Sequence, residues 1–210
     1  MDLKIERRTH PTAQNLVDTV KEMLIHTPYN SLKSENVLFR SGVSRGPLYH
    51  HFENFEDLIE VAQTQIYQDY VGAVVALTRI ATTLGDPLAT RQEFVKILEE
   101  SEKVTTLERR RQRVGLIHNA ASIDSFQEIL SATQESLNRK WMQIYEVCVA
   151  KGWASPEFDS RTVAILMQSA FFGRILDDIS PVHIRPEAWI TTLSRLFDCF
   201  FFCKVLAAEM

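Results

Sequence analysis

The chain has few residues that break helices, with only 7 glycines and 7 prolines among its 210 residues. This scarcity excludes collagen-like and low-complexity architectures. Hydrophobic residues make up 45% of the sequence and charged residues 24%, so a disordered chain is excluded as well. Leu, Ile, Ala, Glu and Gln are frequent, and the composition therefore predicts a globular protein built mainly from helices.

Segments typical of membrane and secreted proteins are also missing. The most apolar stretch, residues 200–208, is interrupted by Lys204 and is far shorter than a membrane span. The first ten residues, MDLKIERRTH, lack the apolar centre of a signal peptide. The 3 cysteines are an odd number, which favours reduced thiols. We therefore expect a cytoplasmic protein that makes no contact with a membrane.

A large excess of positive charge is absent too, because the formal net charge is −4. Most of the acidic excess lies after residue 55, whereas residues 1–55 are close to neutral and contain four of the six histidines. The chain as a whole therefore does not resemble a basic nucleic-acid binder, although a local surface that faces anions is compatible with this distribution.

The sequence contains none of the common catalytic or metal-binding motifs. There is no H-E-x-x-H, Walker A or G-x-G-x-x-G pattern, and no histidine follows a glutamate by three residues, as a di-iron site requires. Residues 42–46 match the G-x-S-x-G pattern of hydrolases, but no strand is predicted before the serine. A zinc site formed by Cys199, Cys203 and His183 is less favoured than buried free thiols. We therefore expect no catalytic residues, no metal and no cofactor.

Hydrophobic spacing predicts helices throughout. Leu16, Val17, Val20, Met23 and Leu24 follow the i, i+1, i+4, i+7, i+8 pattern of one helix face, which predicts a helix over about 12–26. The same reasoning predicts two short helices at 34–41 and up to residue 51, a long helix over about 55–83, and a last helix through 189–201. No segment shows the alternation of a strand, so the prediction is an all-α fold of about nine helices.

Capping residues predict where several helices begin. Asn54 and Asp86 are expected to be N-caps, the latter before Pro87 at the first helical position. Capping boxes are expected at Thr105 with Glu108 and at Ser125 with Glu128, and further helices are expected to open at Ser155–Pro156 and Ser180–Pro181.

Residues 32–55 are the most informative segment. Two short helices are predicted on either side of Gly42, Val43 and Ser44, which is the layout of a helix-turn-helix motif that offers its second helix to the major groove of DNA. Ser44 is expected to cap the second helix. Because Pro47 has no N–H, we expect the Ser44 hydroxyl to accept from the Gly46 N–H.

The run GVSRGPLYHHF, followed by EDL, resembles the TetR/AcrR family of bacterial transcriptional regulators, and the resemblance covers residues 12–60. The matching positions are Gly42, Val43, Ser44, Leu48, Tyr49, His51, Phe52 and Leu58. The resemblance implies a three-helix DNA-binding domain over residues 1–55 and a larger helical domain for ligand binding and dimerisation over residues 56–210.

The family's DNA-contacting positions correspond to particular residues of this chain. The resemblance implies phosphate contacts for Tyr49 and His51 and base contacts for Arg45 and His50. The expected DNA-binding residues are Lys33, Ser34, Arg45, Gly46, Pro47, Tyr49, His50 and His51. The expected small core that holds the two helices together is Val37, Leu38, Leu48 and Phe52.

Two residues depart from the family pattern. Phe55 stands where the family usually has a lysine that contacts phosphate, and Glu35 lies near the groove where some members have a basic residue. Both changes lower the phosphate attraction that dominates DNA affinity, so we expect weaker non-specific binding and more reliance on Arg7, Arg8 and Lys33. An N-terminal arm that reaches DNA through Arg7 and Arg8 and a disordered tail both remain open.

The family's effector pocket lies in the middle of the chain. The expected pocket residues are Phe94, His118, Trp141, Tyr145 and Phe171, although the spacing of the aromatic residues favours core positions. The basic run at 109–113 is interpreted as a solvated helix face that pairs with Glu108, with a clamp for an anionic ligand as the alternative.

The last two long helices contain more aromatic bulk than one helix face can bury, which indicates an interface between two copies. In the family, these helices of each subunit form a four-helix dimer bundle. The expected interface residues are Phe172, Trp189, Leu193, Phe197, Phe200 and Phe201.

The sequence and the resemblance together predict a homodimeric one-component transcriptional regulator. It is expected to bind a nearly palindromic double-stranded operator and to be released by a small-molecule effector that the sequence does not identify. Repression relieved by ligand is the family's usual mode, and activation stays open. The alternative is a helical adaptor that keeps the fold but has lost DNA binding.

Overall fold

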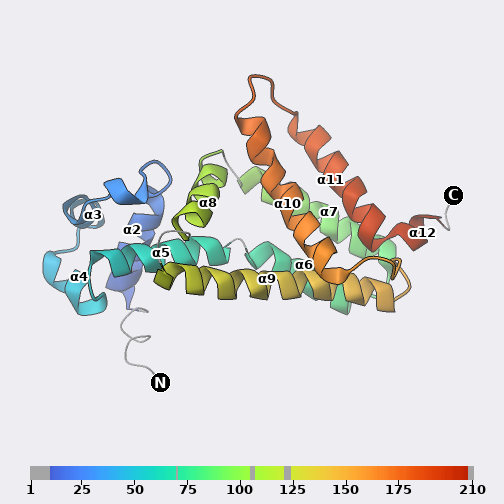
Figure 1. Ribbon diagram of the computed structural model, residues 1–210, viewed down its shortest axis with the longest axis horizontal. Coiled ribbons are helices and arrows are strands. Elements are labelled where there is room, and N and C mark those ends of the chain that lie inside the picture. The colour runs from blue at the N-terminus through green and yellow to red at the C-terminus, as the bar shows by residue number, and fades with distance from the viewer. Residues whose placement is uncertain (1–9, 70, 105–106, 121–123, 208–210) are drawn as a thin grey trace. The chain divides into compact units, whose positions relative to one another are not determined.

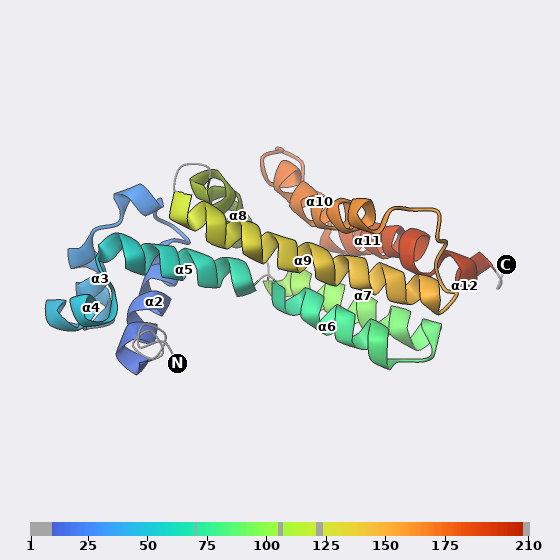
Figure 2. The ribbon, with the colours of Figure 1, turned by 60° about the horizontal axis from the view of Figure 1, so that its bottom comes forward.

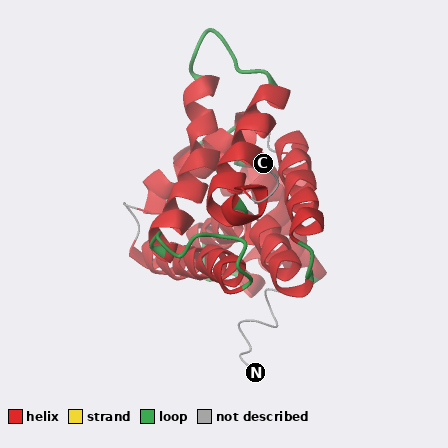
Figure 3. Ribbon diagram, turned by 90° about the vertical axis from the view of Figure 1, so that its right-hand side faces the viewer, coloured by secondary structure: helices red, strands yellow, loops and turns green. Residues whose placement is uncertain are grey.

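The computed structural model describes residues 10–69, 71–104, 107–120 and 124–207. In these ranges the chain forms helices and loops and contains no strand (Figure 3), which confirms the predicted all-α fold. It divides into two compact units. The first comprises the described residues up to 69 together with 111–130, and the second those from 71 to 110 and from 131 onward.

The helices follow one another along the chain with short links (Figure 1). Their bounds are α2 Pro11–Met23, the 3-10 turn η1 Tyr29–Ser31, α3 Ser34–Ser41, α4 Arg45–His51, α5 Phe55–Asp69, α6 Val71–Thr83, α7 Pro87–Val104, α8 Leu107–Ala120, α9 Asp124–Ala150, α10 Ser160–Asp178, α11 Pro186–Phe201 and α12 Cys203–Ala207.

The described ranges contain more helices than the nine expected. The helix expected over 55–83 is described as α5 and α6 on either side of residue 70, with α5 in the first unit and α6 in the second. The last expected helix, through 189–201, corresponds to α11, and the short α12 follows it after the backbone leaves the helical region at Phe202.

The first unit packs α2, α3, α4 and α5 around one apolar cluster. Leu16, Val17 and Val20 are buried along the inner face of α2, as their spacing predicts. Val37, Leu48 and Phe52 are buried and Leu38 is partly buried against them, so the small core expected between the two short helices is confirmed. The complete set of buried apolar residues in this cluster is Ala13, Leu16, Val17, Val20, Leu32, Val37, Leu48, Phe52, Leu58, Ile59 and Ala62.

The second unit is held together by aromatic side chains from α7, α9 and α11 and by Phe202 between α11 and α12. These helices can be followed in Figure 2. Phe94 of α7 lies edge-on to Phe202, with ring centroids 5.6 Å apart. Phe197 of α11 contacts Trp141 of α9 at 5.8 Å and Phe201 one turn further at 5.3 Å. These offset and edge-to-face pairs are the arrangements that aromatic rings prefer, so the cluster is a well-packed core.

Two expected helix starts are confirmed by their capping hydrogen bonds. The Asn54 Oδ1 atom accepts from the Asp57 backbone N–H at 2.7 Å, and the Asp86 Oδ1 atom accepts from the Ala89 N–H at 2.6 Å. These contacts satisfy donors that have no partner within the helix. The two expected capping boxes involve Thr105 and Ser125, which lie outside the described residues and side chains.

Two other expected starts are wrong. α10 begins at Ser160, four residues after Pro156, because the Asp159 carboxylate caps it by accepting from the Thr162 N–H at 2.8 Å. α11 begins at Pro186 rather than at Pro181. The Ser180 hydroxyl accepts from the Val182 N–H at 3.3 Å, which closes a turn instead of opening a helix.

No helix in the described ranges combines the length and the apolar character that crossing a membrane requires.

Candidate nucleic-acid interface

α3 and α4 are joined by the three residues Gly42, Val43 and Ser44. Gly42 has a φ of +67° in the left-handed region, which glycine adopts without the steric cost of a Cβ atom, so it ends α3 and turns the chain. The Asn15 Nδ2 atom of α2 donates to the Ser41 carbonyl at 3.0 Å and holds the end of α3. This geometry is that of a helix-turn-helix.

The expected side-chain cap of α4 is wrong. Ser44 occupies the N-cap position with an extended backbone, but its hydroxyl makes no capping hydrogen bond. Pro47 has no N–H to offer, and both Ser44 and Gly46 are exposed, so water can serve the free backbone donors at this helix start.

Most of the side chains expected to contact DNA lie on the surface of the first unit. Lys33, Arg45 and His50 are exposed, and Tyr49 exposes 50% of its area. Gly46 is exposed as well, whereas Ser34, Pro47 and His51 are half-buried. The outer face of α4 therefore presents a guanidinium, a phenol and imidazoles, all of which can donate to phosphate or to base edges.

Arg45 is not a free cation on this face. Its Nη2 atom lies 4.0 Å from the Glu35 Oε1 atom of α3, and both side chains are largely exposed. An exposed pair at this distance is weak, but the carboxylate still lowers the local positive potential. Glu35, one of the two departures from the family pattern, therefore lies beside the arginine that is expected to contact DNA.

Phe55, the second departure, has a packing role. It is partly buried against the apolar cluster of the first unit at the first position of α5. A lysine there would place its charge at the surface, whereas the phenylalanine adds apolar contact to the small core.

Sequence reasoning missed two residues of this surface. Phe39 of α3 is 91% exposed, which is unusual for a phenylalanine in a small domain. The sequence gives no signal of this exposure, because the residue type alone predicts an inner position. His10 was missed as well, although a histidine directly before Pro11 at the first helical position occupies an N-cap site.

His10, His50 and His51 form a cluster at the start of α2 and the end of α4. The rings of His10 and His51 are stacked, with centroids 5.0 Å apart and an interplanar angle of 21°. The His50 ring lies edge-on to His51, also at 5.0 Å. The His10 Nδ1 atom accepts from the Thr12 backbone N–H at 3.2 Å and thereby caps α2.

Comparisons with known proteins agree with this geometry. No family model matches the chain. The transcriptional regulator AcuR of Cereibacter sphaeroides is 25% identical over 190 residues, which span 90% of this chain and 84% of AcuR. The regulatory protein TetR from Rhodobacter sphaeroides is 23% identical with a TM-score of 0.67, covering 89% of this chain and 98% of that one. The reduced form of E. coli NemR is 12% identical with a TM-score of 0.70, covering 93% and 100%.

The chain has the TetR/AcrR fold and the helix-turn-helix motif of that family. The coarse function that the curated relative and the structural neighbours support is that of a TetR-type transcriptional regulator.

Three of the residues expected to line an effector pocket are core residues. Phe94, Trp141 and Tyr145 are buried in the aromatic cluster of the second unit, where their neighbours are other side chains. Phe171 is half-buried and lies 6.3 Å from Trp141, between their ring centroids. The side chain of His118 lies outside what the structure describes. Phe94, Trp141 and Tyr145 are therefore core residues, which is the interpretation that the sequence favoured.

A buried group of amides was missed by sequence reasoning. The Gln168 Nε2 atom of α10 donates to the Asn138 Oδ1 atom of α9 at 2.9 Å, and Gln134 donates to both partners at 2.7 and 2.8 Å. Asn138 and Gln168 are buried although their side chains are polar. Buried amides satisfy one another here, and no periodicity in the sequence distinguishes them from exposed ones.

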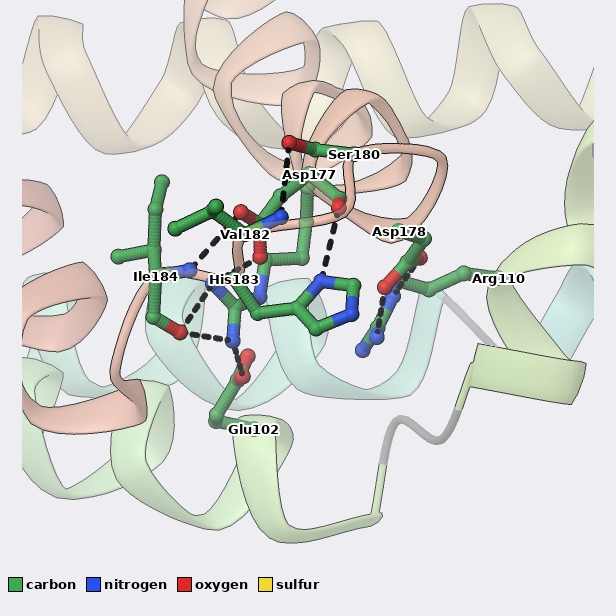
Figure 4. A network of polar contacts seen from close by, with 9 residues as sticks. Glu102, Arg110, Asp177, Asp178, Ser180, Val182, His183 and Ile184 are labelled. Carbon is green, nitrogen blue, oxygen red and sulfur yellow. Dashed lines mark hydrogen bonds and ion pairs between the residues drawn. The ribbon is translucent and has the colours of Figure 1, made fainter.

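Figure 4 shows a second buried polar group, at the C-terminal end of α10. Arg110 of α8 forms a two-pronged ion pair with Asp178, with both N–O distances at 2.6 Å, and this hydrogen bonding raises the pKa of Arg110. The expectation of a solvated basic face is thus wrong for Arg110, which pairs with an acid 68 positions away. The reason is tertiary packing, which the local spacing of charges does not reveal.

Arg174 is the centre of the same group. Its side chain is buried and lies 3.3 Å from the Glu102 carboxylate of α7 and 3.1 Å from that of Asp177. Burial raises the pKa of Glu102, and the nearby Arg174 guanidinium acts in the opposite direction. Asp177 also accepts from the Ile184 N–H at 2.9 Å, so these ion pairs hold the link between α10 and α11 to the helices beneath it (Figure 4).

The expected interface residues divide between the core and the surface. Leu193, Phe197 and Phe201 are buried in the core of their own subunit, so they are corrected to core residues. The reason is that α11 turns its most apolar face toward α7 and α9. The other three, Phe172, Trp189 and Phe200, are half-buried.

The apolar residues that remain exposed in this part of the chain were not predicted. They lie along the outer face of α10 and in the link to α11, and they are Ile165, Leu166, Leu176, Ile179, Val182 and Ile184.

Proposed function

We propose that this chain is a one-component transcriptional regulator that binds a nearly palindromic operator as a homodimer. The observation that carries the proposal is the helix-turn-helix of the first unit. Its short helix α4 buries Leu48 against α2 and turns Arg45, Tyr49 and His50 toward solvent. A buried inner face and a polar, basic and aromatic outer face are what a helix needs in order to enter a major groove.

The proposal assigns DNA contacts to the residues named above. Arg45 and His50 are proposed to reach base edges, and Tyr49 and His51 to contact phosphates, with Lys33 and Ser34 anchoring α3 to the backbone. Gly46 and Pro47 give the start of α4 a small profile, which allows close approach to the sugar–phosphate chain. The DNA-binding domain is proposed to comprise the short helices of residues 1–55, with α5 packed on its core.

The homodimer is proposed to form through the outer face of α10. Leu176, Ile179 and Val182 expose 67, 76 and 78% of their areas, so they are available to a second copy of the chain. Exposed apolar stripes of this kind commonly mark interfaces. The half-buried Phe172, Trp189 and Phe200 are proposed to border this contact.

A small-molecule effector is proposed to bind in the second unit and to release the operator. Its recognition is proposed to involve Phe171, the expected pocket residue that is half-buried beside Trp141. Such an effector shifts the equilibrium only if it prefers a subunit geometry that no longer fits the operator. Repression relieved by the effector is the mode that the proposal adopts.

The test compares Arg45→Ala with Arg161→Ala. Arg161 is an exposed arginine of the second unit that pairs with Glu135 at 2.8 Å, so its removal is a matched loss of charge far from α4 in sequence. Binding is measured by fluorescence anisotropy on duplexes enriched by the wild-type protein from a random library. The proposal predicts that Arg45→Ala lowers affinity by about 10-fold or more with its oligomeric state unchanged, as loss of a bidentate base contact does.

Arg161→Ala is expected to bind like the wild type. Equal affinity of Arg45→Ala and the wild type would contradict the assignment of α4 as the recognition helix.

A further inference from the structure

The histidine cluster at the start of α2 has a feature that the DNA contacts alone do not explain. His10 is not a residue of the helix-turn-helix, yet its ring is stacked on that of His51 with the centroids 5.0 Å apart. His51 is also one of the proposed phosphate contacts. The surroundings of the two rings decide which imidazole takes a positive charge when a polyanion is near.

The His10 ring accepts a hydrogen bond at the start of α2. Its Nδ1 atom accepts from the Thr12 backbone N–H, so this nitrogen carries no proton and the ring proton sits on Nε2. His10 also stands at the N-terminal end of the 13-residue α2, where the helix dipole disfavours a cation. The cap and the dipole therefore act on the same imidazole that is stacked on His51.

The surroundings of His51 favour a charge there instead. His50 and His51 belong to the last turn of α4, where free backbone carbonyls stabilise cations. The neutral His10 ring faces His51 at an interplanar angle of 21°, so its π electrons lie against the neighbouring ring. An aromatic face within about 6 Å of a cation attracts it.

We infer that His10 is a positioning residue of the DNA interface, whose neutral ring stabilises the protonated form of His51, so that DNA binding takes up a proton at His51. This inference rests on the proposed function, because it requires phosphate to approach α4. The phosphate favours the imidazolium, and the free energy of proton uptake then adds to the affinity. Affinity for DNA therefore rises as the pH falls through the range in which histidines become charged.

The other charged groups on the elements around α4 do not supply this pH dependence. Among the described residues they include Arg45 and Glu35, the exposed pair at 4.0 Å, Arg40 of α3 with Glu22 of α2, Asp18 of α2, which accepts from Gln14, and Asp57 in the first turn of α5, whose carboxylate accepts from the Glu53 N–H. Carboxylates and guanidinium groups as classes keep their charges between about pH 6 and 8. Of the side-chain types named here, imidazole is the one that changes charge in that window.

Two substitutions of His10 separate its two contacts. His10→Asn keeps an acceptor at the N-cap, where asparagine is among the best residues, but removes the aromatic face. His10→Phe keeps the face and removes the cap. His51→Asn removes the proton site itself. His26→Asn is the matched control, because His26 is an exposed histidine of the same unit that follows α2.

The measured quantity is the ratio of the dissociation constants at about pH 7.5 and pH 6.0, at constant ionic strength, for a fluorescent duplex enriched from a random library. We expect the wild type, His26→Asn and His10→Phe to bind about 5- to 10-fold more tightly at the lower pH, since one proton changes affinity at most about 10-fold per pH unit. We expect less than about a 2-fold change for His10→Asn and His51→Asn. A His10→Asn protein that keeps the full wild-type ratio would overturn the inference.

A second readout separates this inference from the proposed function. The ring protons of His51 are followed by NMR titration in the free protein, with no DNA present. The inference predicts that His51 gains its proton at a lower pH in His10→Asn than in the wild type or in His10→Phe. If the wild type binds no duplex at either pH, the proposed function fails and the titration alone decides the His10–His51 coupling. An unchanged His51 titration in His10→Asn would then overturn it.

Discussion

Glu35 is the side chain whose charge most directly opposes the proposed DNA contact. Its carboxylate lies 4.0 Å from the Arg45 guanidinium, on the neighbouring helix of the motif. Glu35→Gln removes the repulsion with phosphate and leaves Arg45 without a competing partner. We predict that its affinity for the enriched duplex rises about 3- to 10-fold at moderate salt, with a steeper salt dependence.

The control for this prediction is Glu135→Gln, which removes an exposed acid that pairs with Arg161 in the second unit. It is expected to leave the affinity unchanged. An unaltered or weaker affinity of Glu35→Gln would show that Glu35 does not face the DNA.

The cysteines differ in reactivity because they differ in burial. Burial raises the pKa of the Cys148 thiol to about 12, whereas Cys199 is exposed. Since the thiolate is the reactive form, we predict that an aromatic disulfide reagent at about pH 8 modifies Cys199 rapidly and Cys148 only after unfolding. Cys199→Ser should lose the fast phase of the absorbance change. Loss of that phase in Cys148→Ser instead would contradict the burial of Cys148.

Single positions show what the sequence can and cannot predict. The burial of Val37, Leu48 and Phe52 follows from helical spacing and from the matched motif, and both give the same answer. The exposure of Phe39 does not follow, because its residue type alone predicts an inner position. Cys199 was expected to be buried and is exposed, since the helix break at Phe202 and the packing of α11 decide its face.

At the scale of helices, local capping signals succeed where nothing competes with them. Asn54 and Asp86 cap α5 and α7 as expected. They fail where the same residue type serves another contact. The Ser155 carbonyl accepts from the Tyr145 hydroxyl, and the next helix, α10, begins only at Ser160, where Asp159 caps it. Since Ser, Asp and Pro all lie within 155–160, the sequence offers several starts and packing selects one of them.

The cap of α10 makes a prediction about pH. Hydrogen bonds from the Thr162 hydroxyl and backbone N–H to the carboxylate lower the pKa of Asp159. The cap therefore stabilises the fold above the ordinary range of aspartate, near about pH 4, and this contribution is lost as the pH falls through the lowered pKa. We predict that Asp159→Ala lowers the thermal midpoint at neutral pH, and that the difference from the wild type becomes smaller as the pH falls through the lowered pKa.

Asp159→Asn is the matched variant, because the amide oxygen still accepts from the Thr162 N–H but has no charge to lose. It should melt close to the wild type at neutral pH and above Asp159→Ala, by a difference that does not depend on the charge of residue 159, as followed by circular dichroism. Equal midpoints of Asp159→Ala and the wild type at neutral pH would contradict the capping role.

For the whole molecule, the sequence predicted the all-α fold and the location of the helix-turn-helix, but not which apolar residues lie in the core and which lie at the surface. Leu193, Phe197 and Phe201 were expected at the interface and lie in the core. Helical periodicity identifies an apolar face but does not say whether that face meets the same chain or another copy. Long-range ion pairs such as Arg110 with Asp178 are equally invisible to local spacing.

The proposed dimer face on α10 predicts a change of oligomeric state. Leu176→Glu places a charge at a residue that is 67% exposed in the subunit, so the subunit itself should stay folded. Burying that charge between two copies is costly, and we predict monomers in analytical ultracentrifugation at concentrations where the wild type is dimeric. Val75→Glu changes an exposed apolar residue of α6 and should leave the dimer intact. A dimeric Leu176→Glu protein would move the interface away from α10.

The selection of duplexes from a random DNA library by the purified protein, at moderate salt, tests the central claim most directly. A dimer with two recognition helices predicts enrichment of an inverted repeat whose half-sites lie about one helical turn apart, about 34–36 Å. The same selection with Arg45→Ala should lose this enrichment. No enriched sequence at moderate or at low salt would contradict a DNA-binding regulator and would favour a helical adaptor that keeps the fold without binding DNA.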